Sequence, residues 1–222
     1  MHEIAVNEDI LAGNDAAARH NREHFIEHGV YVVNLMSAPG AGKTTLLERT
    51  LERMAGKHRV GVIEGDVATS ADAERIRRLG VPAIQINTGG ECHLDARQIH
   101  RELAAIQLEE LDLLVIENVG NLVCPAEFDL GEHDKVMVLS TTEGDDKPRK
   151  YPVMFHVARA LLLNKMDLLP HVDFDVAKAE REARALNLDL EIFRVSGRTG
   201  AGMDAWVTWL EERMRRVKAA AT

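Results

Sequence analysis

The amino-acid sequence predicts an α/β protein with a mostly parallel sheet of about seven strands flanked by helices, preceded by an extra N-terminal helix. Short β-rich runs alternate with helical patterns along the chain, an order typical of a doubly wound sheet. The β-rich runs are mostly continuous apolar segments, as expected when helices cover both faces of a parallel sheet. With 222 residues, 45% of them apolar, and no linker-like stretch, the chain can form one domain with a full core.

The expected elements follow one another in regular order. Strands are expected at 30–36, 60–64, 83–87, 113–117, 135–140, 160–164 and 190–195. Helices are expected near 43–55, 69–79, 93–108, 149–158, 174–187 and 202–217. We therefore divide the chain into an N-terminal helical extension, residues 1–29, and one domain over residues 30–222.

A polar helix is expected over residues 7–28, before the first strand. His20, His24 and His28 recur at every fourth position and therefore share one face of this helix. Three imidazoles in this arrangement could bind a transition metal, but a solvated helix face shows the same spacing. The sequence leaves both interpretations open.

Charge and hydropathy restrict the classes of partner. A net charge of -9 argues against a non-specific nucleic-acid binder, which would concentrate basic residues. No apolar run approaches the length of a membrane span, and the acidic N-terminus does not resemble a signal peptide. We therefore expect a cytoplasmic protein with no nucleic-acid or membrane partner. In that compartment the two cysteines are expected to be thiols or metal ligands rather than a disulfide.

The first expected strand runs into a glycine-rich segment, SAPGAGKTT over residues 37–45, which matches the Walker A pattern at all but its first position. Ser37 stands where that pattern has its first glycine. Lys43 is expected to reach the β- and γ-phosphates, and Thr44 to ligate Mg²⁺. Because a strand precedes the motif and a helix follows it, the sequence predicts a P-loop NTPase domain. The expected phosphate-binding residues are Gly40, Ala41, Gly42, Lys43, Thr44 and Thr45.

Residues 164–167 read NKMD at the end of an expected strand, which fits the N-K-x-D element of GTPases. Asp167 can accept hydrogen bonds from the ring N–H and the exocyclic amine of guanine, a donor pair that adenine lacks. A polar loop after a strand is the alternative interpretation of so short a match. The SGR turn at 196–198, which resembles a second guanine-contacting loop, favours GTP. The expected base-binding residues are Asn164, Lys165, Asp167, Ser196, Gly197 and Arg198.

Two acids close expected strands at the carboxyl end, where ligands of open α/β sheets bind. Glu117 is followed three residues later by Gly120, giving E-x-x-G where many GTPases have D-x-x-G. Such a turn senses the γ-phosphate through the glycine N–H. Asp66 is expected to contact Mg²⁺ or to position water, although a solvated strand end is the alternative for both acids. The expected catalytic set is Lys43, Asp66, Glu117 and Gly120, with Mg²⁺ at Thr44, Asp66 and Glu117.

Cys92 and His93 follow one expected strand, and Cys124 follows the Gly120 turn. Two thiolates and an imidazole suit Zn²⁺ or Ni²⁺ far better than Mg²⁺ or Ca²⁺. Three ligands leave a coordination position open, which fits reversible handling of a metal better than a closed structural site. Distant cysteines alone are weak evidence, since a small buried cysteine is often part of a core.

Together these motifs resemble the HypB family of hydrogenase maturation GTPases. The matching blocks are SAPGAGKTTLL, VIEGD, PAIQINTG, CHLDA, IENVGNLVCPAEFDLGE, TEGDDKPRKYP, LLLNKMDLLP and SGRTGAGMDAWVTWL, in order from about residue 30 to 210. The resemblance implies GTP hydrolysis coupled to nickel insertion into the [NiFe]-hydrogenase large subunit. It also implies a GTP-dependent homodimer, a companion nickel-delivery accessory protein, and a Ni²⁺ or Zn²⁺ site at the subunit interface. The ligands would be Cys92, His93 and Cys124.

The chain departs from this family in one respect and leaves three other functions to weigh. Many members carry an N-terminal cysteine motif or a His-rich tract, and this sequence shows neither, so high-affinity nickel storage at the N-terminus is not expected. A urease-type nickel GTPase would have a Cys-Pro-His triplet, whereas Cys92 and His93 are adjacent here. A zinc-stabilised signalling GTPase also fits the ligands. The NKMD element argues against a nucleotide-dependent kinase.

Overall fold

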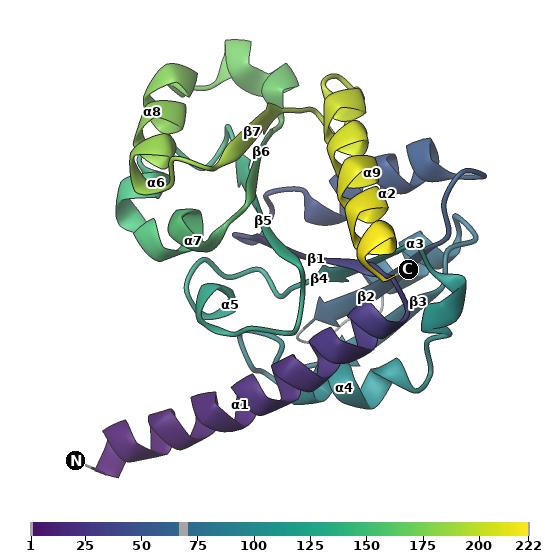
Figure 1. Ribbon diagram of the computed structural model, residues 1–222. Coiled ribbons are helices and arrows are strands. Elements are labelled where there is room, and N and C mark those ends of the chain that lie inside the picture. Colours follow the sequence, from purple (N-terminus) through teal and green to yellow (C-terminus); the bar gives the residue numbers. More distant parts are fainter. Residues whose placement is uncertain (1, 67–70, 222) are drawn as a thin grey trace.

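The computed structural model describes residues 2–66 and 71–221 and contains one seven-stranded sheet (Figure 1). The strand order is β3-β2-β4-β1-β5-β6-β7, and every neighbouring pair is parallel. The predicted parallel sheet is confirmed, and each strand agrees with its expected range within two residues at either end. The strands are β1 (Tyr31–Ser37), β2 (Val60–Asp66), β3 (Ala83–Asn87), β4 (Leu113–Glu117), β5 (Asp134–Ser140), β6 (Ala160–Asn164) and β7 (Glu191–Arg194).

Helices cover both faces of the sheet, as the continuous apolar strands predict. On one face α2, α3 and α9 pack over a large apolar cluster, and on the other α1, α4, α5, α7 and α8 cover two smaller ones. The helices are α1 (His2–Glu27), α2 (Lys43–Met54), α3 (Ala71–Arg77), α4 (Ala96–Leu103), α5 (Cys124–Glu127), α6 (Lys147–Lys150), α7 (Pro152–Val157), α8 (Val176–Leu186) and α9 (Met203–Ala220). Two 3-10 turns are η1 (Leu108–Glu110) and η2 (Met166–His171).

Three expected helices are shorter or broken, for local reasons. The helix expected at 93–108 begins only at Ala96, because Asp95 caps it by accepting a hydrogen bond from the backbone N–H of Gln98. The helix expected at 149–158 is divided into α6 and α7, since Pro152 can begin a helix but cannot lie inside one. The helix expected at 174–187 begins at Val176 after a cap by Asp175. Of the helix expected at 69–79, positions 69 and 70 lie outside the described residues.

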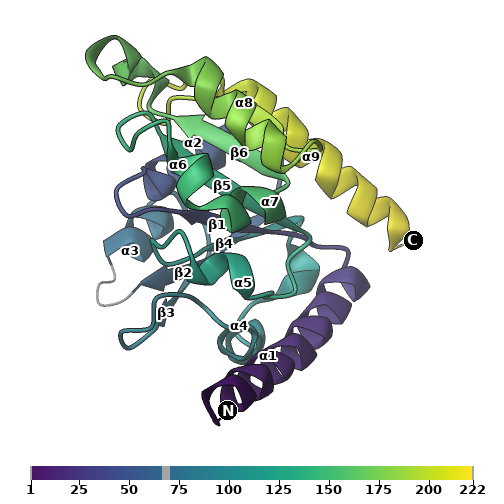
Figure 2. The same ribbon diagram turned by 90° about the vertical axis from the view of Figure 1, so that its left-hand side faces the viewer.

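The N-terminal helix α1 lies against α4, as both ribbon views show (Figure 2). Phe25 of α1 is fully buried in the core under the sheet. Polar anchors are unusual in number along this helix. The Asn21 amide, fully buried, donates to the backbone carbonyls of Ala96 (2.8 Å) and Leu130 (3.0 Å). The Asn14 carboxamide accepts from the Ala96 backbone N–H at 2.9 Å, so α1 is joined to the first residue of α4.

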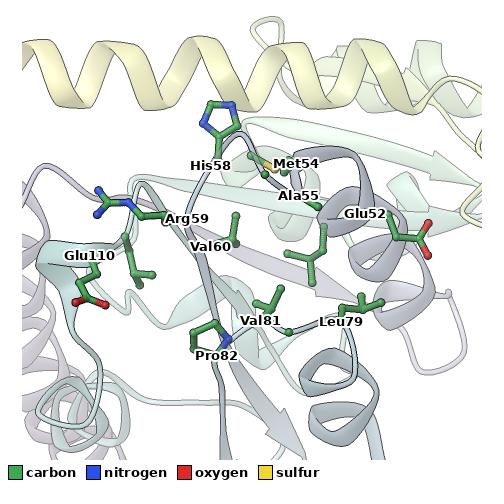
Figure 3. Close-up of a pocket in the computed structure, with 14 residues that line it drawn as sticks. Glu52, Met54, Ala55, His58, Arg59, Val60, Leu79, Val81, Pro82 and Glu110 are labelled. Carbon is green, nitrogen blue, oxygen red and sulfur yellow. The ribbon is translucent and has the colours of Figure 1, made fainter.

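No helix among the described residues is long and apolar enough to cross a membrane. A cavity of about 540 Å³ lies at the amino-end edge of the sheet, where Val60 begins β2 (Figure 3). His58 and Arg59 lie at its rim, and Val81 and Pro82 line its far side. Ligands of parallel α/β sheets bind at the opposite, carboxyl ends of the strands. This cavity is therefore separate from the predicted nucleotide site.

Candidate nucleotide site and metal centre

The carboxyl ends of β1, β2 and β4 meet around a cavity of about 410 Å³. Parallel register places Glu64 of β2 beside Glu117 of β4, and Glu117 beside Leu35 of β1. The P-loop begins directly after β1 and forms one wall. Sequence-predicted residues that line this cavity are Gly40, Gly42, Lys43, Thr44, Thr45, Asp66, Glu117 and Gly120.

The P-loop has the backbone that its glycines allow. Gly40 (φ 74°) and Gly42 (φ 92°) are both in the left-handed region, which disfavours a side chain. A Cβ on Gly42 would also lie 2.9 Å from the Asn164 amide nitrogen. Ser37, in place of the first glycine, is fully buried, donates to the Ala38 carbonyl at 2.6 Å and accepts from Lys43 Nζ at 3.0 Å. The serine therefore holds the Lys43 ammonium against the start of the P-loop.

The two expected base-binding loops are joined by side chains that the sequence assigned to guanine. The Asn164 amide donates to the Ala41 carbonyl at 3.0 Å and its Oδ1 accepts from the Gly197 N–H at 3.1 Å, so it connects the P-loop with the 196–198 turn. Ser196 Oγ donates to Asp167 Oδ1 at 2.6 Å. Lys165 is the one non-glycine residue with positive φ (60°) among the described residues, and its Nζ donates to the Gly40 carbonyl at 2.7 Å.

Arg198 is exposed, and its backbone carbonyl accepts a hydrogen bond from Arg49 at 3.2 Å. Arg49 also donates to the Gly197 carbonyl at 3.2 Å. The 196–198 turn is therefore held against α2, the helix that follows the P-loop. Phosphate-side and base-side residues are thus brought to one end of the molecule, as the motifs predicted.

Glu64 and Glu117 form a buried carboxyl pair beside the P-loop. Burial, together with the neighbouring Glu117 carboxylate, raises the pKa of Glu64 to about 10. Burial also raises the pKa of Glu117, although Lys43 and the Thr44 hydroxyl oppose that shift. Thr44 Oγ1 donates to Glu117 Oε1 at 2.9 Å. The pair therefore retains a proton at neutral pH.

The buried oxygens of this carboxyl pair show whether the residues fit a divalent cation. Glu64 Oε1 and Glu117 Oε2 are buried without a hydrogen-bond partner in the described structure. Unpaired buried oxygens are costly, and carboxylate and hydroxyl oxygens are the ligands that Mg²⁺ prefers. Glu117 and Thr44 thus fit the predicted Mg²⁺ role. No sequence motif marks Glu64; its position in the site follows from its register with Glu117.

Gly120 and Asp66 lie where the motifs placed them. A Cβ on Gly120 would lie 3.0 Å from Pro39 Cα, so this turn packs directly on the P-loop. Asp66 ends β2 at the cavity, and its backbone carbonyl accepts from the Thr88 N–H at 3.0 Å. The structure adds Arg75 of α3, which is paired with Glu48 (2.6 Å) and Asp72 (3.1 Å) at the cavity wall. Nothing in the sequence distinguished this arginine, because its partners come from two different helices.

The predicted metal ligands lie together although the chain separates them. Cys92 Sγ is 2.8 Å from Cys124 Sγ and 3.7 Å from His93 Nδ1, and the three ligand atoms all lie within 4.8 Å of one another. The thiol–thiol hydrogen bond raises the pKa of Cys124 to about 11, and burial lowers the pKa of His93. The His93 ring stacks on Phe128, with centroids 3.8 Å apart. A soft metal ion binding here would displace the thiol protons.

One buried side chain connects the nucleotide turn with the metal centre. Asn118, which follows Glu117, accepts from the Leu94 N–H (3.1 Å) and the Val119 N–H (2.9 Å) on the same Oδ1 atom. Leu94 directly follows His93, and its side chain packs against Gly65 of β2. The residues after Glu64 and after Glu117 therefore both touch the segment that carries Cys92 and His93.

The sheet order, the P-loop after β1 and the two base-side loops define a P-loop nucleotide-binding protein. A family model described as "CobW/HypB/UreG, nucleotide-binding domain" matches residues 31–194. The hydrogenase maturation factor HypB of Azotobacter vinelandii is 54% identical over 217 residues, covering 97% of this chain and 72% of that protein. The chain belongs to the CobW/HypB/UreG family and, within it, to the HypB hydrogenase maturation GTPases.

Solved structures agree with the fold and extend over nearly the whole chain. HypB from Helicobacter pylori, in complex with nickel, superposes with a TM-score of 0.88 at 38% identity, covering 92% of this chain and 96% of that one. HypB from Archaeoglobus fulgidus superposes with a TM-score of 0.86 at 44% identity, covering 92% and 100%.

Proposed function

We propose that the two sites of this protein are coupled. The nucleotide bound at the P-loop sets the affinity of the metal centre for its metal ion. The chain is a GTP-hydrolysing nickel metallochaperone of [NiFe]-hydrogenase maturation. Nickel is its cargo, and the proposed ligands are Cys92, His93 and Cys124. Ligand softness admits Zn²⁺ at the same position.

On the nucleotide side, the P-loop N–H groups and Lys43 bind the phosphates, and Asp167 accepts from guanine. Thr44 and Glu117 would hold Mg²⁺, with Asp66 beside them, and the ion would neutralise charge on the β- and γ-phosphates. Gly120, which packs against Pro39, would contact the γ-phosphate through its N–H.

The observation that carries the coupling is the Asn118 bridge. Its Oδ1 holds Val119 of the nucleotide turn and Leu94 of the metal segment at once. A shift of the turn when γ-phosphate binds or leaves must therefore move Leu94 or break a buried hydrogen bond, which costs roughly 1–3 kcal/mol. Cys124, four residues after Gly120, moves with the other end of the same turn.

The proposed assembly is a homodimer favoured by GTP, with the open coordination position facing the second copy. Cys92 is exposed and Val123, beside Cys124, is 51% exposed, so a partner can reach the ligands. A companion nickel-delivery protein and the hydrogenase large subunit are the proposed source and destination of the metal.

Nickel titration in the presence of a non-hydrolysable GTP analogue, and separately of GDP, tests the proposal. Coupling predicts that the nickel affinities of the GTP-analogue-bound and GDP-bound protein differ at least about fivefold. By linkage, nickel must change the ratio of the two nucleotide affinities by the same factor. Light scattering on the same samples reports the dimer. Equal nickel affinities in the two nucleotide states would refute the coupling.

The bridge is tested with a matched pair of variants. Asn118→Ala removes the acceptor shared by Leu94 and Val119 and should reduce the ratio of the two nickel affinities towards one. Asn118→Asp keeps an acceptor oxygen for Leu94 and Val119 but loses the amide that donates to Asn34 Oδ1 at 3.2 Å, so it should preserve part of the ratio in protein that is shown to fold. A ratio unchanged in Asn118→Ala, in protein that still binds GTP, would exclude this bridge as the connection.

A further inference from the structure

A group of imidazoles lies on α1 and α4, apart from the Cys92–His93–Cys124 centre. We propose that it is a second transition-metal site. Its core is formed by His24 and Glu27 of α1 and by His28, which directly follows that helix, and its neighbouring imidazoles are His20 of α1 and His100 of α4. The site contains no sulfur ligand, so it does not depend on the cysteine centre or on the nucleotide coupling proposed above.

The three core side chains already lie close together at the C-terminal end of α1. One ligand atom from each of His24, Glu27 and His28 lies within 4.8 Å of the others. Spacings of three and four residues place these side chains next to each other on one helix face. His24 is half-buried, whereas Glu27 and His28 are exposed, so an ion can enter from solvent.

The tautomer of His28 is set for metal binding. Its Nδ1 lies 2.8 Å from the backbone carbonyl oxygen of His24, and a carbonyl oxygen can only accept a hydrogen bond. Nδ1 therefore carries the proton, and the lone pair of a neutral His28 ring is on Nε2. Metal-binding histidines are commonly oriented by a second-shell hydrogen bond of this kind.

His100 is fixed in the same way from the second helix. Its Nδ1 lies 3.2 Å from Oδ1 of Asn21. The Asn21 amide nitrogen already donates to the carbonyls of Ala96 and Leu130, so the oxygen of this buried side chain faces His100. The His100 Nδ1 must donate to it, which leaves Nε2 as the ligand atom.

The rings are also close together. Ring centroids are 4.7 Å apart for His20 and His24, and 4.8 Å apart for His20 and His100. The His24 ring lies 6.3 Å from that of His100 and 6.2 Å from that of His28. The repeat along α1 explains three of these rings, but His100 comes from α4, which the ribbon views show alongside α1 (Figures 1 and 2).

The ligand atoms determine the class of ion that this site would bind. Imidazole nitrogens with one carboxylate suit Ni²⁺, Co²⁺, Zn²⁺ and Cu²⁺, and offer little to Mg²⁺ or Ca²⁺. Because thiolates are absent, the site should bind more weakly and exchange faster than the cysteine centre.

The test uses the untagged full chain with both thiolates removed, Cys92→Ser/Cys124→Ser. Equilibrium dialysis against NiCl₂ should find one ion per chain, and Co²⁺ should bind without the thiolate-to-metal charge-transfer band. Adding His24→Ala/His28→Ala should lower nickel affinity at least about tenfold. Adding His100→Ala should lower it by a smaller factor, whereas His171→Ala, an exposed histidine on η2, should have no effect.

Two outcomes would overturn the site: no nickel bound by the cysteine double variant, or full affinity after the His24 and His28 substitutions. An unchanged affinity in His100→Ala would remove α4 from it. His28, His100 and His171 are exposed and His24 is not fully buried, so circular dichroism should confirm that these variants fold. None of these results bears on the nucleotide–nickel coupling, which is read separately with the GTP analogue and GDP.

Discussion

The nucleotide cavity and the cysteine metal centre lie at the same edge of the sheet but are built differently. Glu64, Glu117 and Asn164 belong to buried strand ends, where the register of parallel strands sets their positions. Cys92 lies in the exposed loop before α4, and Cys124 is the first residue of the short helix α5. The first site is therefore fixed by the core, whereas the second depends on how these two segments outside the sheet lie against each other.

This difference indicates that the nucleotide site keeps its shape and that the geometry of the cysteine site changes with the nucleotide state. A site made of strand ends can keep its shape while it binds and releases nucleotide. A site made of segments outside the sheet can gain or lose ligands when either segment shifts by a small amount. Asn118 spans the boundary between the two, since it follows a strand end and holds a loop residue.

Lys43→Ala should give the largest effect, because it removes the cation that the transferred phosphoryl group requires. Loss of one such stabilising group lowers turnover by about 10²–10³-fold. Phosphate release under saturating GTP is the measurement. Nickel affinity in nucleotide-free protein should be unchanged; a parallel loss of nickel affinity would break the distinction between the two regions.

Asp167→Asn should weaken GTP binding by about 10–100-fold, as expected for a charged hydrogen-bond acceptor that contributes roughly 1.5–3 kcal/mol. The asparagine presents an N–H₂ group to guanine donors, so xanthosine triphosphate, with a carbonyl at that position, should lose less. Dissociation constants of the two nucleotides give the comparison. Unchanged GTP affinity would refute the base-binding assignment.

Cys124→Ala should lower nickel affinity at the cysteine centre at least about tenfold while leaving GTP affinity intact. The titration is best made with His24→Ala/His28→Ala also present, so that imidazole binding on α1 does not mask the loss. Cys124→Ser, which offers a harder oxygen, should bind nickel poorly as well. Full affinity in either variant would show that Cys124 is not a ligand.

Glu64→Gln should have the smallest effect, on the pH dependence of stability without nucleotide or metal. The folded pKa of Glu64, about 10, is above its unfolded value, so its contribution is most favourable at low pH and is lost as pH rises towards 10. Between pH 6 and 8 the wild type should lose stability relative to the variant, by at most about 1.4 kcal/mol per pH unit. Urea unfolding at both values measures this, with exposed Glu212→Gln as control. Parallel pH profiles would contradict the buried pair.

Much of the fold and of both sites followed from the sequence because their signals are local. Continuous apolar runs marked all seven strands, and the glycines of the P-loop and the NKMD element occupy short segments whose geometry depends on their own residues. The metal ligands needed the family resemblance as well, since spacing alone does not show that residues 92 and 124 meet.

The remaining features depend on contacts between distant segments. The register of β2 and β4 places Glu64 beside Glu117. Asn118 connects two segments because the Leu94 N–H donates to its side chain. The sequence does not indicate a role for His100, because its ring lies near the α1 histidines only through the packing of α4 beside α1. Helix ends were displaced where a cap or a proline outweighed the apolar pattern, as at Asp95 and Pro152.

The buried asparagines of α1 have a practical consequence for anyone shortening this chain. Asn21 ties down Ala96, three residues after His93, and Leu130, six residues after Cys124. A truncation at residue 29 would leave both carbonyls without these donors and would release the two segments that follow the metal ligands. The first helix thus holds together the two segments that carry the proposed metal ligands, and a shortened chain should keep its nucleotide chemistry more readily than the geometry of the candidate metal site.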